Sequence, residues 1–224
     1  MTQPVPSLFP PNLGRVAVKI CGIRTGAQAE AIIEAGADAL GINFWPKSKR
    51  FIELDEALPW LNEIAGTVPR VAVTVNATDD ELHRLHESGG LDWLQLHGDE
   101  SPDRVESLIQ QGLPVFRAMG VKDSAMLESA ATYPGTNLLL DAYAPIEYGG
   151  SGETMDWTLG AKAVQQWPER QIILAGGLVP GNVAAAVKQV RPAAVDVASG
   201  VESEPGVKDL GLVKAFIEAA RTTL

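Results

Sequence analysis

Eight short β-forming runs, separated by longer helical patterns, constrain the fold of this chain more than any other feature of its sequence. Most of the runs are nearly continuous apolar stretches, which is typical of strands buried on both faces of a parallel sheet. Successive runs begin about 20–35 residues apart, which is the length of one βα unit in a barrel enzyme. The runs cover residues 16–20, 37–44, 70–75, 92–96, 114–118, 136–140, 171–175 and 193–198.

Helical patterns fill the intervals between several of these runs. The pattern at 101–111 opens with Ser101 and Pro102, residue types that favour the N-cap and the first turn of a helix. The 224 residues contain no mid-chain linker, so we predict one α/β domain, a single (β/α)8 TIM barrel over residues 16–224. A doubly wound open sheet is the alternative. The helical patterns cover residues 25–35, 79–87, 101–111, 182–190 and 209–221.

The first fifteen residues differ in character from the rest of the chain. They contain four prolines and carry no charged residue before Arg15. They lack the basic start and the long apolar core of a signal peptide, so we expect residues 1–15 to be a flexible lead-in. No stretch of the chain approaches the roughly 18 consecutive apolar residues of a membrane span. These features predict a cytoplasmic protein without a membrane partner.

The net charge and the scarcity of metal ligands argue against two classes of function. The net charge is −10, and binding of duplex nucleic acid depends on cations that neutralise phosphates. Cys21 is the single cysteine, which excludes an intramolecular disulfide and a cysteine-based metal site. His83 and His86 lie three residues apart on a predicted helix, without a third ligand candidate nearby. We therefore expect no nucleic-acid partner and no bound metal.

Two reactive side chains stand at the ends of predicted strands, where a (β/α)8 barrel carries its catalytic residues. Cys21 comes directly after the first run. A lone cysteine is often a small buried hydrophobe, but a thiolate here can act as a general base if its pKa is lowered. Asp141 follows the sixth run. An aspartate there can simply cap a helix, whereas a partly desolvated carboxyl has a raised pKa and can act as a general acid.

Cationic and imidazole side chains follow two other runs. Arg50 comes after the second run, and its guanidinium suits a bidentate contact with a carboxylate or phosphate. We expect the neighbouring Lys47 and Lys49 to be solvated loop charges. His97 ends the fourth run, where a single histidine is more often a hydrogen-bonded structural residue than a ligand.

Glycine-containing loops follow the last two runs, and together they predict a phosphate site. Gly177 lies in the first of these loops, and Ser199 and Gly200 lie in the second. Either loop alone is weak evidence, because glycine marks any tight turn. The pair after the seventh and eighth strands matches the usual phosphate position of this barrel, where backbone N–H groups point at the anion.

Six segments together resemble a known family. They are VKICGIR, EAGADALGINFWPKSKRFI, LQLHGDE, LLLDAYAPIEYGGSGETMDW, LAGGLVPGNV and VDVASGVESEPGVKD. The combination, above all KICG with the GGSG and SGVE stretches, resembles the phosphoribosylanthranilate isomerase family of tryptophan biosynthesis. Ala175 and Ala198 stand where many members of that family carry serine, which removes a hydroxyl donor near the phosphate but leaves the backbone donors.

The resemblance implies an Amadori rearrangement of N-(5-phosphoribosyl)anthranilate, a small phosphoribosyl substrate. It assigns the general base to Cys21 and the general acid to Asp141, and it places Arg50 near the anthranilate carboxylate. No cofactor is implied, because an iminium formed from the substrate itself serves as the electron sink. The remaining implied positions are Gly177, Ser199 and Gly200 for the phosphate, and His97 and Asp196 for the lining of the pocket.

Two other functions remain open at this point. A related barrel can act on another phosphorylated sugar. Ribulose-phosphate epimerases usually need metal ligands at the strand ends, which this sequence lacks. The histidine-pathway isomerase relies on two aspartates, whereas the first run of this chain is followed by Cys21. A catalytically silent barrel can bind a phosphometabolite for regulation, although the presence of both Cys21 and Asp141 argues against it. The oligomeric state stays open between a monomer and a homodimer.

Overall fold

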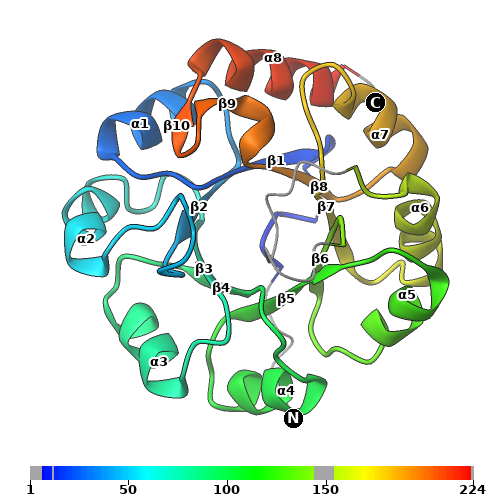
Figure 1. Cartoon of the computed structure of the whole chain (residues 1–224), viewed down its shortest axis with the longest axis horizontal. Coiled ribbons are helices and arrows are strands. Elements are labelled where there is room, and N and C mark those ends of the chain that lie inside the picture. The colour runs from blue at the N-terminus through cyan, green and yellow to red at the C-terminus, as the bar shows by residue number, and fades with distance from the viewer. Residues whose placement is uncertain (1–6, 12, 144–153, 223–224) are drawn as a thin grey trace.

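A closed barrel of parallel strands forms the centre of the molecule (Figure 1). The structure is a computed structural model in which residues 7–11, 13–143 and 154–222 are described. Within these residues, eight strands pair in chain order and the last pairs with the first, so the predicted TIM barrel is confirmed and the open sheet is wrong. The strands are β1 (Ala17–Cys21), β2 (Ala39–Asn43), β3 (Arg70–Thr74), β4 (Trp93–Leu96), β5 (Val115–Gly120), β6 (Asn137–Asp141), β7 (Gln171–Leu174) and β8 (Ala194–Val197).

A ring of helices surrounds the barrel (Figure 1). They are α1 (Gly26–Glu34), α2 (Leu54–Glu63), α3 (Asp79–Glu87), α4 (Pro102–Gln110), α5 (Ser124–Ala130), α6 (Trp157–Gln166), α7 (Val183–Val190) and α8 (Leu210–Arg221). All five predicted helical patterns are helices, and Ser101 caps α4 by accepting a hydrogen bond from Arg104 N at 3.2 Å. The helices α2, α5 and α6 were not predicted from the sequence. Pro59 interrupts the helical pattern of α2, and α5 has only seven residues.

Each strand points alternate side chains toward the helices and into the barrel, as the pleat requires. In β1, Val18 and Ile20 belong to the large apolar core between the strands and the helix ring. Ala17, Lys19 and Cys21 face the barrel interior. The alternation explains why the strands read as continuous buried runs, because both of their faces lie against protein.

The lower part of the barrel interior, near the N-terminal ends of the strands, is apolar. Trp93 and Phe116 fill it from β4 and β5, with their ring centroids 6.2 Å apart in an edge-to-face arrangement. Small side chains such as Ala17, Ala39 and Ala194 stand beside them on the other strands. Large and small residues thus share this layer, which leaves room for side chains from outside the strands.

Two residues of the N-terminal lead-in occupy that room. Leu8 and Phe9 are almost fully buried and belong to the same apolar cluster. Leu8 N donates to Asn137 Oδ1 at 2.9 Å, while the Gln171 side chain accepts from Phe9 N at 3.1 Å and donates to Phe9 O at 2.7 Å. Apolar burial and paired backbone groups therefore hold these two residues of the segment that we expect to be a flexible lead-in. The division of the chain at residue 15 stays a prediction.

An unpredicted hairpin follows the last strand of the barrel. A short 3-10 turn, η1 (Ser199–Val201), leads into β9 (Glu202–Glu204), which pairs antiparallel with β10 (Val207–Lys208). In Figure 1 the hairpin lies outside the barrel strands, between α1 and α8. Among the described residues, no helix is long and apolar enough to cross a membrane.

Candidate active site

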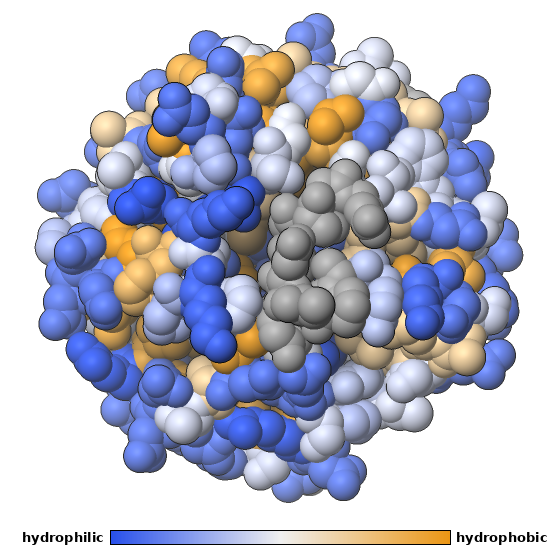
Figure 2. Space-filling model, in the orientation of Figure 1, coloured by the Kyte–Doolittle hydropathy of each residue, from blue (hydrophilic) through white to orange (hydrophobic). Residues whose placement is uncertain are grey.

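A cavity of about 600 Å³ opens at the C-terminal ends of the strands. Figure 2 looks onto this face of the molecule, where hydrophilic side chains predominate. The lining includes Lys47 and Lys49, which are exposed at its rim. Gly177 and Gly200 are not among the described residues that line the cavity. The predicted site residues that do line it are Cys21, Arg50, His97, Asp141, Asp196 and Ser199.

Cys21 is the last residue of β1, because the strand ends one residue later than the sequence pattern predicts. Gly22 follows with a φ of +88°, and a side chain there would collide with Arg50, which lies across it. Burial raises the pKa of the Cys21 thiol; Lys19 opposes this shift and Asp196 adds to it. Burial alone therefore makes the thiol a weaker acid, and only nearby cations favour the thiolate.

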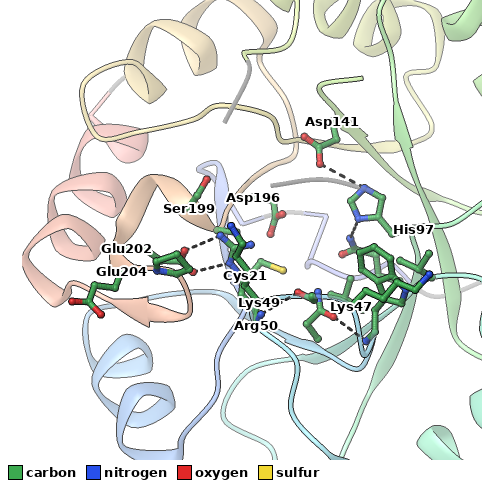
Figure 3. Close-up of a pocket in the computed structure, with 18 of the residues that line it drawn as sticks. Cys21, Lys47, Lys49, Arg50, His97, Asp141, Asp196, Ser199, Glu202 and Glu204 are labelled. Carbon is green, nitrogen blue, oxygen red and sulfur yellow. Dashed lines mark hydrogen bonds and ion pairs between the residues drawn. The ribbon is translucent and has the colours of Figure 1, made fainter. Parts of the chain in front are cut away.

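Asp141 is the last residue of β6 and is buried at the opposite wall of the cavity (Figure 3). Its Oδ1 accepts a hydrogen bond from Ala142 N at 2.7 Å. Burial is the largest cause that raises the pKa of Asp141 to about 7; Asp196 contributes to the rise, and Ala142 N and Lys19 oppose it. A carboxyl group with this pKa is still partly protonated at neutral pH, as a general acid must be.

His97 contacts Asp141 and is held in a neutral form. Its Nε2 lies 3.5 Å from Asp141 Oδ2, and its Nδ1 lies 3.3 Å from Gln95 Nε2 (Figure 3). Burial lowers the pKa of His97 to about 3, with Arg117 and Lys19 adding to the effect. A neutral imidazole therefore stands between the Gln95 amide and the Asp141 carboxyl group.

Arg50 is held by a carboxylate from the far end of the chain. Its Nε and Nη2 each donate to Glu202 at 2.7 Å, in a bidentate pair that is almost fully buried on the Glu202 side. Lys208 Nζ donates to the same carboxylate at 2.7 Å and to Ala198 O at 2.9 Å. Two of the three guanidinium nitrogens are thus engaged by protein, which fixes the direction of the third.

The loops after β7 and β8 touch each other beside the cavity. A side chain at Gly200 would collide with Leu178 O, so only glycine allows this approach. Asn182 holds the first loop by accepting from Val179 N at 2.8 Å and donating to Gly177 O at 2.9 Å. Ser199 of the second loop borders the cavity (Figure 3). The two predicted phosphate loops therefore lie side by side.

Four polar residues of this region escape prediction from the sequence. Lys19 carries a signal that the sequence offers, because a lysine in a buried run, two positions before Cys21, faces the barrel interior. Gln95 has the same spacing to His97. Glu202 has no local signal for its contact with Arg50, which lies 152 residues away, and its pair with Lys208 depends on the unpredicted hairpin. Among the described residues, no group of three or more His, Cys, Asp or Glu is placed to hold a metal.

Comparison with known proteins identifies the family of this barrel. Residues 18–219 match the family model described as N-(5'phosphoribosyl)anthranilate (PRA) isomerase. The chain belongs to the phosphoribosylanthranilate isomerase family. It is an enzyme of tryptophan biosynthesis that converts N-(5′-phosphoribosyl)anthranilate into 1-(2-carboxyphenylamino)-1-deoxyribulose 5-phosphate. The resemblance seen in the sequence motifs is confirmed.

Curated relatives and solved structures agree over nearly the whole chain. The N-(5'-phosphoribosyl)anthranilate isomerase of Trichlorobacter lovleyi is 42% identical over 209 residues, which cover 93% of this chain and all of that protein. The isomerase of Myxococcus xanthus is 44% identical over 213 residues, with 92% and 97% covered. The crystal structure of the Thermus thermophilus isomerase superposes with a TM-score of 0.80 at 36% identity, covering 91% of this chain and 98% of that one.

One similar crystal structure contains a ligand. It is a phosphoribosylanthranilate isomerase in complex with reduced 1-(o-carboxyphenylamino)-1-deoxyribulose 5-phosphate. Its TM-score to this chain is 0.77 at 35% identity, with 92% of this chain and 98% of that chain covered.

Proposed function

We propose that Cys21 is the general base and Asp141 the general acid of this isomerisation. The observation that carries the proposal is that both side chains border one cavity from strands that are not neighbours in the barrel. The reaction needs an acid at the ring oxygen and a base at C2′, so two groups on separate walls suit it. The pKa of Asp141, about 7, supports its part as the acid.

The chemistry follows from these two positions. Asp141 donates its proton to the furanose ring oxygen while the bond from that oxygen to C1′ breaks, and the aniline nitrogen supplies the electron pair that forms the iminium. The Cys21 thiolate then removes the proton from C2′, and the C–H electron pair neutralises the iminium to give an enolamine. Protonation at C1′ and loss of the C2′ hydroxyl proton yield the ketone. Each positioned acid or base contributes about 10²–10⁴-fold.

The other predicted residues are proposed to bind the substrate. Arg50 faces the anthranilate carboxylate, and its bidentate pair with Glu202 supports this role because it pre-orients the guanidinium. His97 and Asp196 are proposed to contact the sugar from the cavity wall. The phosphate is proposed to bind the contacting loops through Gly177, Ser199 and Gly200. A similar structure that holds a reduced carboxyphenylamino-deoxyribulose phosphate supports a phosphoribosyl ligand.

The broader setting of the enzyme is also a proposal. We place it in the cytoplasm, without a nucleic-acid, membrane, cofactor or metal partner, and with residues 16–224 as the catalytic domain. It acts as a monomer or a homodimer. One similar crystal structure is described as mutually generated monomers of the dimeric isomerase of Thermotoga maritima, with a TM-score of 0.79 at 37% identity.

The decisive experiment concerns Cys21, the single sulfhydryl of the chain. Cys21→Ser should fold normally and turn over at least about 100-fold more slowly, because a hydroxyl cannot reach the basicity of a thiolate. Turnover is followed by the fluorescence of phosphoribosylanthranilate made in situ from anthranilate and phosphoribosyl pyrophosphate. Iodoacetamide should inactivate the wild type in step with one adduct by mass, and a product analogue should protect it. A fully alkylated protein that keeps its wild-type rate removes Cys21 from the mechanism.

A further inference from the structure

A fully buried lysine lies directly beneath the proposed base. Lys19 stands two positions before Cys21 on β1, so both side chains face the barrel interior. Its exposed fraction is zero, and it faces the barrel interior that such folds usually fill with Val, Ile or Leu. An ammonium group is costly to bury unless it is paired, and a hydrophobic residue of similar volume would serve packing equally well. A role in packing therefore does not account for Lys19.

Lys19 lies between a carboxylate and the thiol. Its Nζ donates to Asp196 Oδ1 at 2.8 Å, and Asp196 is its partner in the register of β1 with β8. On the other side, a methyl group built on Gly41 would lie 2.7 Å from Cys21 Sγ and 2.9 Å from Lys19 Nζ. Both atoms therefore pack over the same bare Cα. Glycine at position 41 lets the ammonium and the sulfur approach each other.

Several charged groups surround the thiol, and most of them are paired with one another. Arg50 and Lys208 share the carboxylate of Glu202. Lys19 is the strongest of the charges that lower the pKa of Cys21, whereas Asp196 raises it. The titratable or charged groups around the thiol and its cavity are Lys19 itself, Asp196 of β8, Lys208 of β10, Glu202 and Glu204 of β9, Lys47, Lys49 and Arg50 of the loop after β2, and His97 and Asp141 across the cavity.

We propose that Lys19 is a positioning residue whose buried ammonium stabilises the Cys21 thiolate, and that Asp196 moderates this effect by competing for the same ammonium. The proposal rests on the role of Cys21 as the base. In the step concerned, the C2′–H bond breaks, the S–H bond forms and the electron pair passes to the substrate iminium. Lys19 keeps its proton throughout.

The test measures the ionisation of the single cysteine directly. The rate of iodoacetamide alkylation is followed against pH, and its midpoint reports the thiol. Lys19→Met should raise the midpoint by about one pH unit or more, as expected when an opposite charge close to the group is removed. The same variant should lower kcat with little change in KM, and the rising limb of its pH–rate profile should move by the same amount.

Two further variants keep the result interpretable. Asp196→Asn should lower the midpoint, because the ammonium is then left to the thiol; its alkylation alone is measured, since Asp196 borders the cavity. Arg70→Met removes another buried strand cation, paired with Asp92 at the lower end of the barrel, and should leave the midpoint unchanged. If the role of Lys19 is purely structural, the alkylation midpoint should not shift in any of the three variants.

The outcomes separate this proposal from the one on which it rests. An unchanged midpoint in Lys19→Met overturns the role of Lys19, even if Cys21→Ser is inactive. A raised midpoint with an unmoved pH–rate profile instead removes Cys21 as the base, and with it the catalytic part of this proposal. If Lys19→Met does not fold, Asp196→Asn decides, and a midpoint that stays or rises in that variant overturns the proposal.

Discussion

The upper and lower layers of the barrel interior are built from the same strands. In β1, Ala17 belongs to the lower layer, and Lys19 and Cys21 belong to the upper one. The lower layer is apolar and is completed by Leu8 and Phe9 from outside the barrel. The upper layer holds buried charges and acid–base groups around a cavity. Two residues along a strand are enough to pass from a packing layer to a chemical one.

The two layers contribute differently to the stability and to the activity of the barrel. Apolar burial in the lower layer stabilises the barrel, at about 25 cal/mol for each Å² removed from water. Groups such as Lys19 and Asp141 are buried at a cost that this packing must offset. Changes in the upper layer should therefore cost activity more than stability, and changes in the lower layer should do the reverse.

The largest expected effect comes from the upper layer. Asp141→Asn should lower kcat by about 10²–10⁴-fold, because an amide cannot donate the acid proton. The matched control is His97→Asn, which should lose less, since it removes only a neutral neighbour of the carboxyl group. Steady-state kinetics of both variants provide the measurement. If Asp141→Asn keeps more than a tenth of the wild-type kcat, the acid must be another residue.

The same variant should also change how stability depends on pH. The pKa of Asp141 is about 7 when folded, above its ordinary value of 3.8. The unfolded chain therefore releases this proton first, and wild-type stability falls as pH rises from about 4 to 7. Asp141→Asn removes this loss, so its free energy of unfolding should exceed that of the wild type at pH 8 and match it near pH 4. Urea titrations at both pH values test the sign, and a less stable variant at pH 8 contradicts the raised pKa.

The lower layer gives the next effect, on stability alone. Phe9→Ala should reduce the free energy of unfolding by up to about 3–5 kcal/mol, the usual cost of truncating a buried aromatic ring. Its kcat should stay at the wild-type value, because the cavity lies at the other end of the barrel. Pro10→Ala, at an exposed neighbour, is the control. Denaturant melts that show no difference between the two variants would mean that Phe9 does not dock in solution.

A smaller effect is expected at the rim of the cavity. Arg50→Ala should lower kcat/KM by an amount equivalent to roughly 1.5–3 kcal/mol, the value of a hydrogen bond to a charged group. The Glu202 carboxylate keeps Lys208 as a partner, so the fold should survive. Arg84→Ala, which breaks an exposed ion pair with Asp55, should leave the kinetics unchanged. Equal kinetics in both variants would reduce Arg50 to a structural clamp on Glu202.

Removal of metal ions is expected to have no effect on turnover. Prolonged treatment with EDTA should leave turnover unchanged, because the sequence offers no ligand cluster for a metal. The assay is the same fluorescence measurement, made before and after dialysis. Activity that disappears and returns on addition of zinc or magnesium would reveal a site in the upper layer.

The sequence by itself determined the architecture and indicated the candidate site residues at the strand ends. Strands buried on both faces read as continuous apolar runs, so their positions and order were predictable from local pattern. The ends of those runs then indicated Cys21 and Asp141, because parallel strands bring their C-terminal ends to one face. The cap at Ser101 was predictable for a similar reason, since its partner lies three residues away.

The tertiary structure alone decided which distant groups meet. The carboxylate on Arg50 comes from 152 residues away, and the partner of Lys19 from 177 residues away. Phe9 finds its hydrogen bonds on Gln171, 162 residues along the chain. No local pattern carries such pairings, because they depend on the register of β8 with β1 and on the room that small side chains leave inside the barrel. Periodicity predicts which face a side chain takes, and only the closed barrel determines what it meets there.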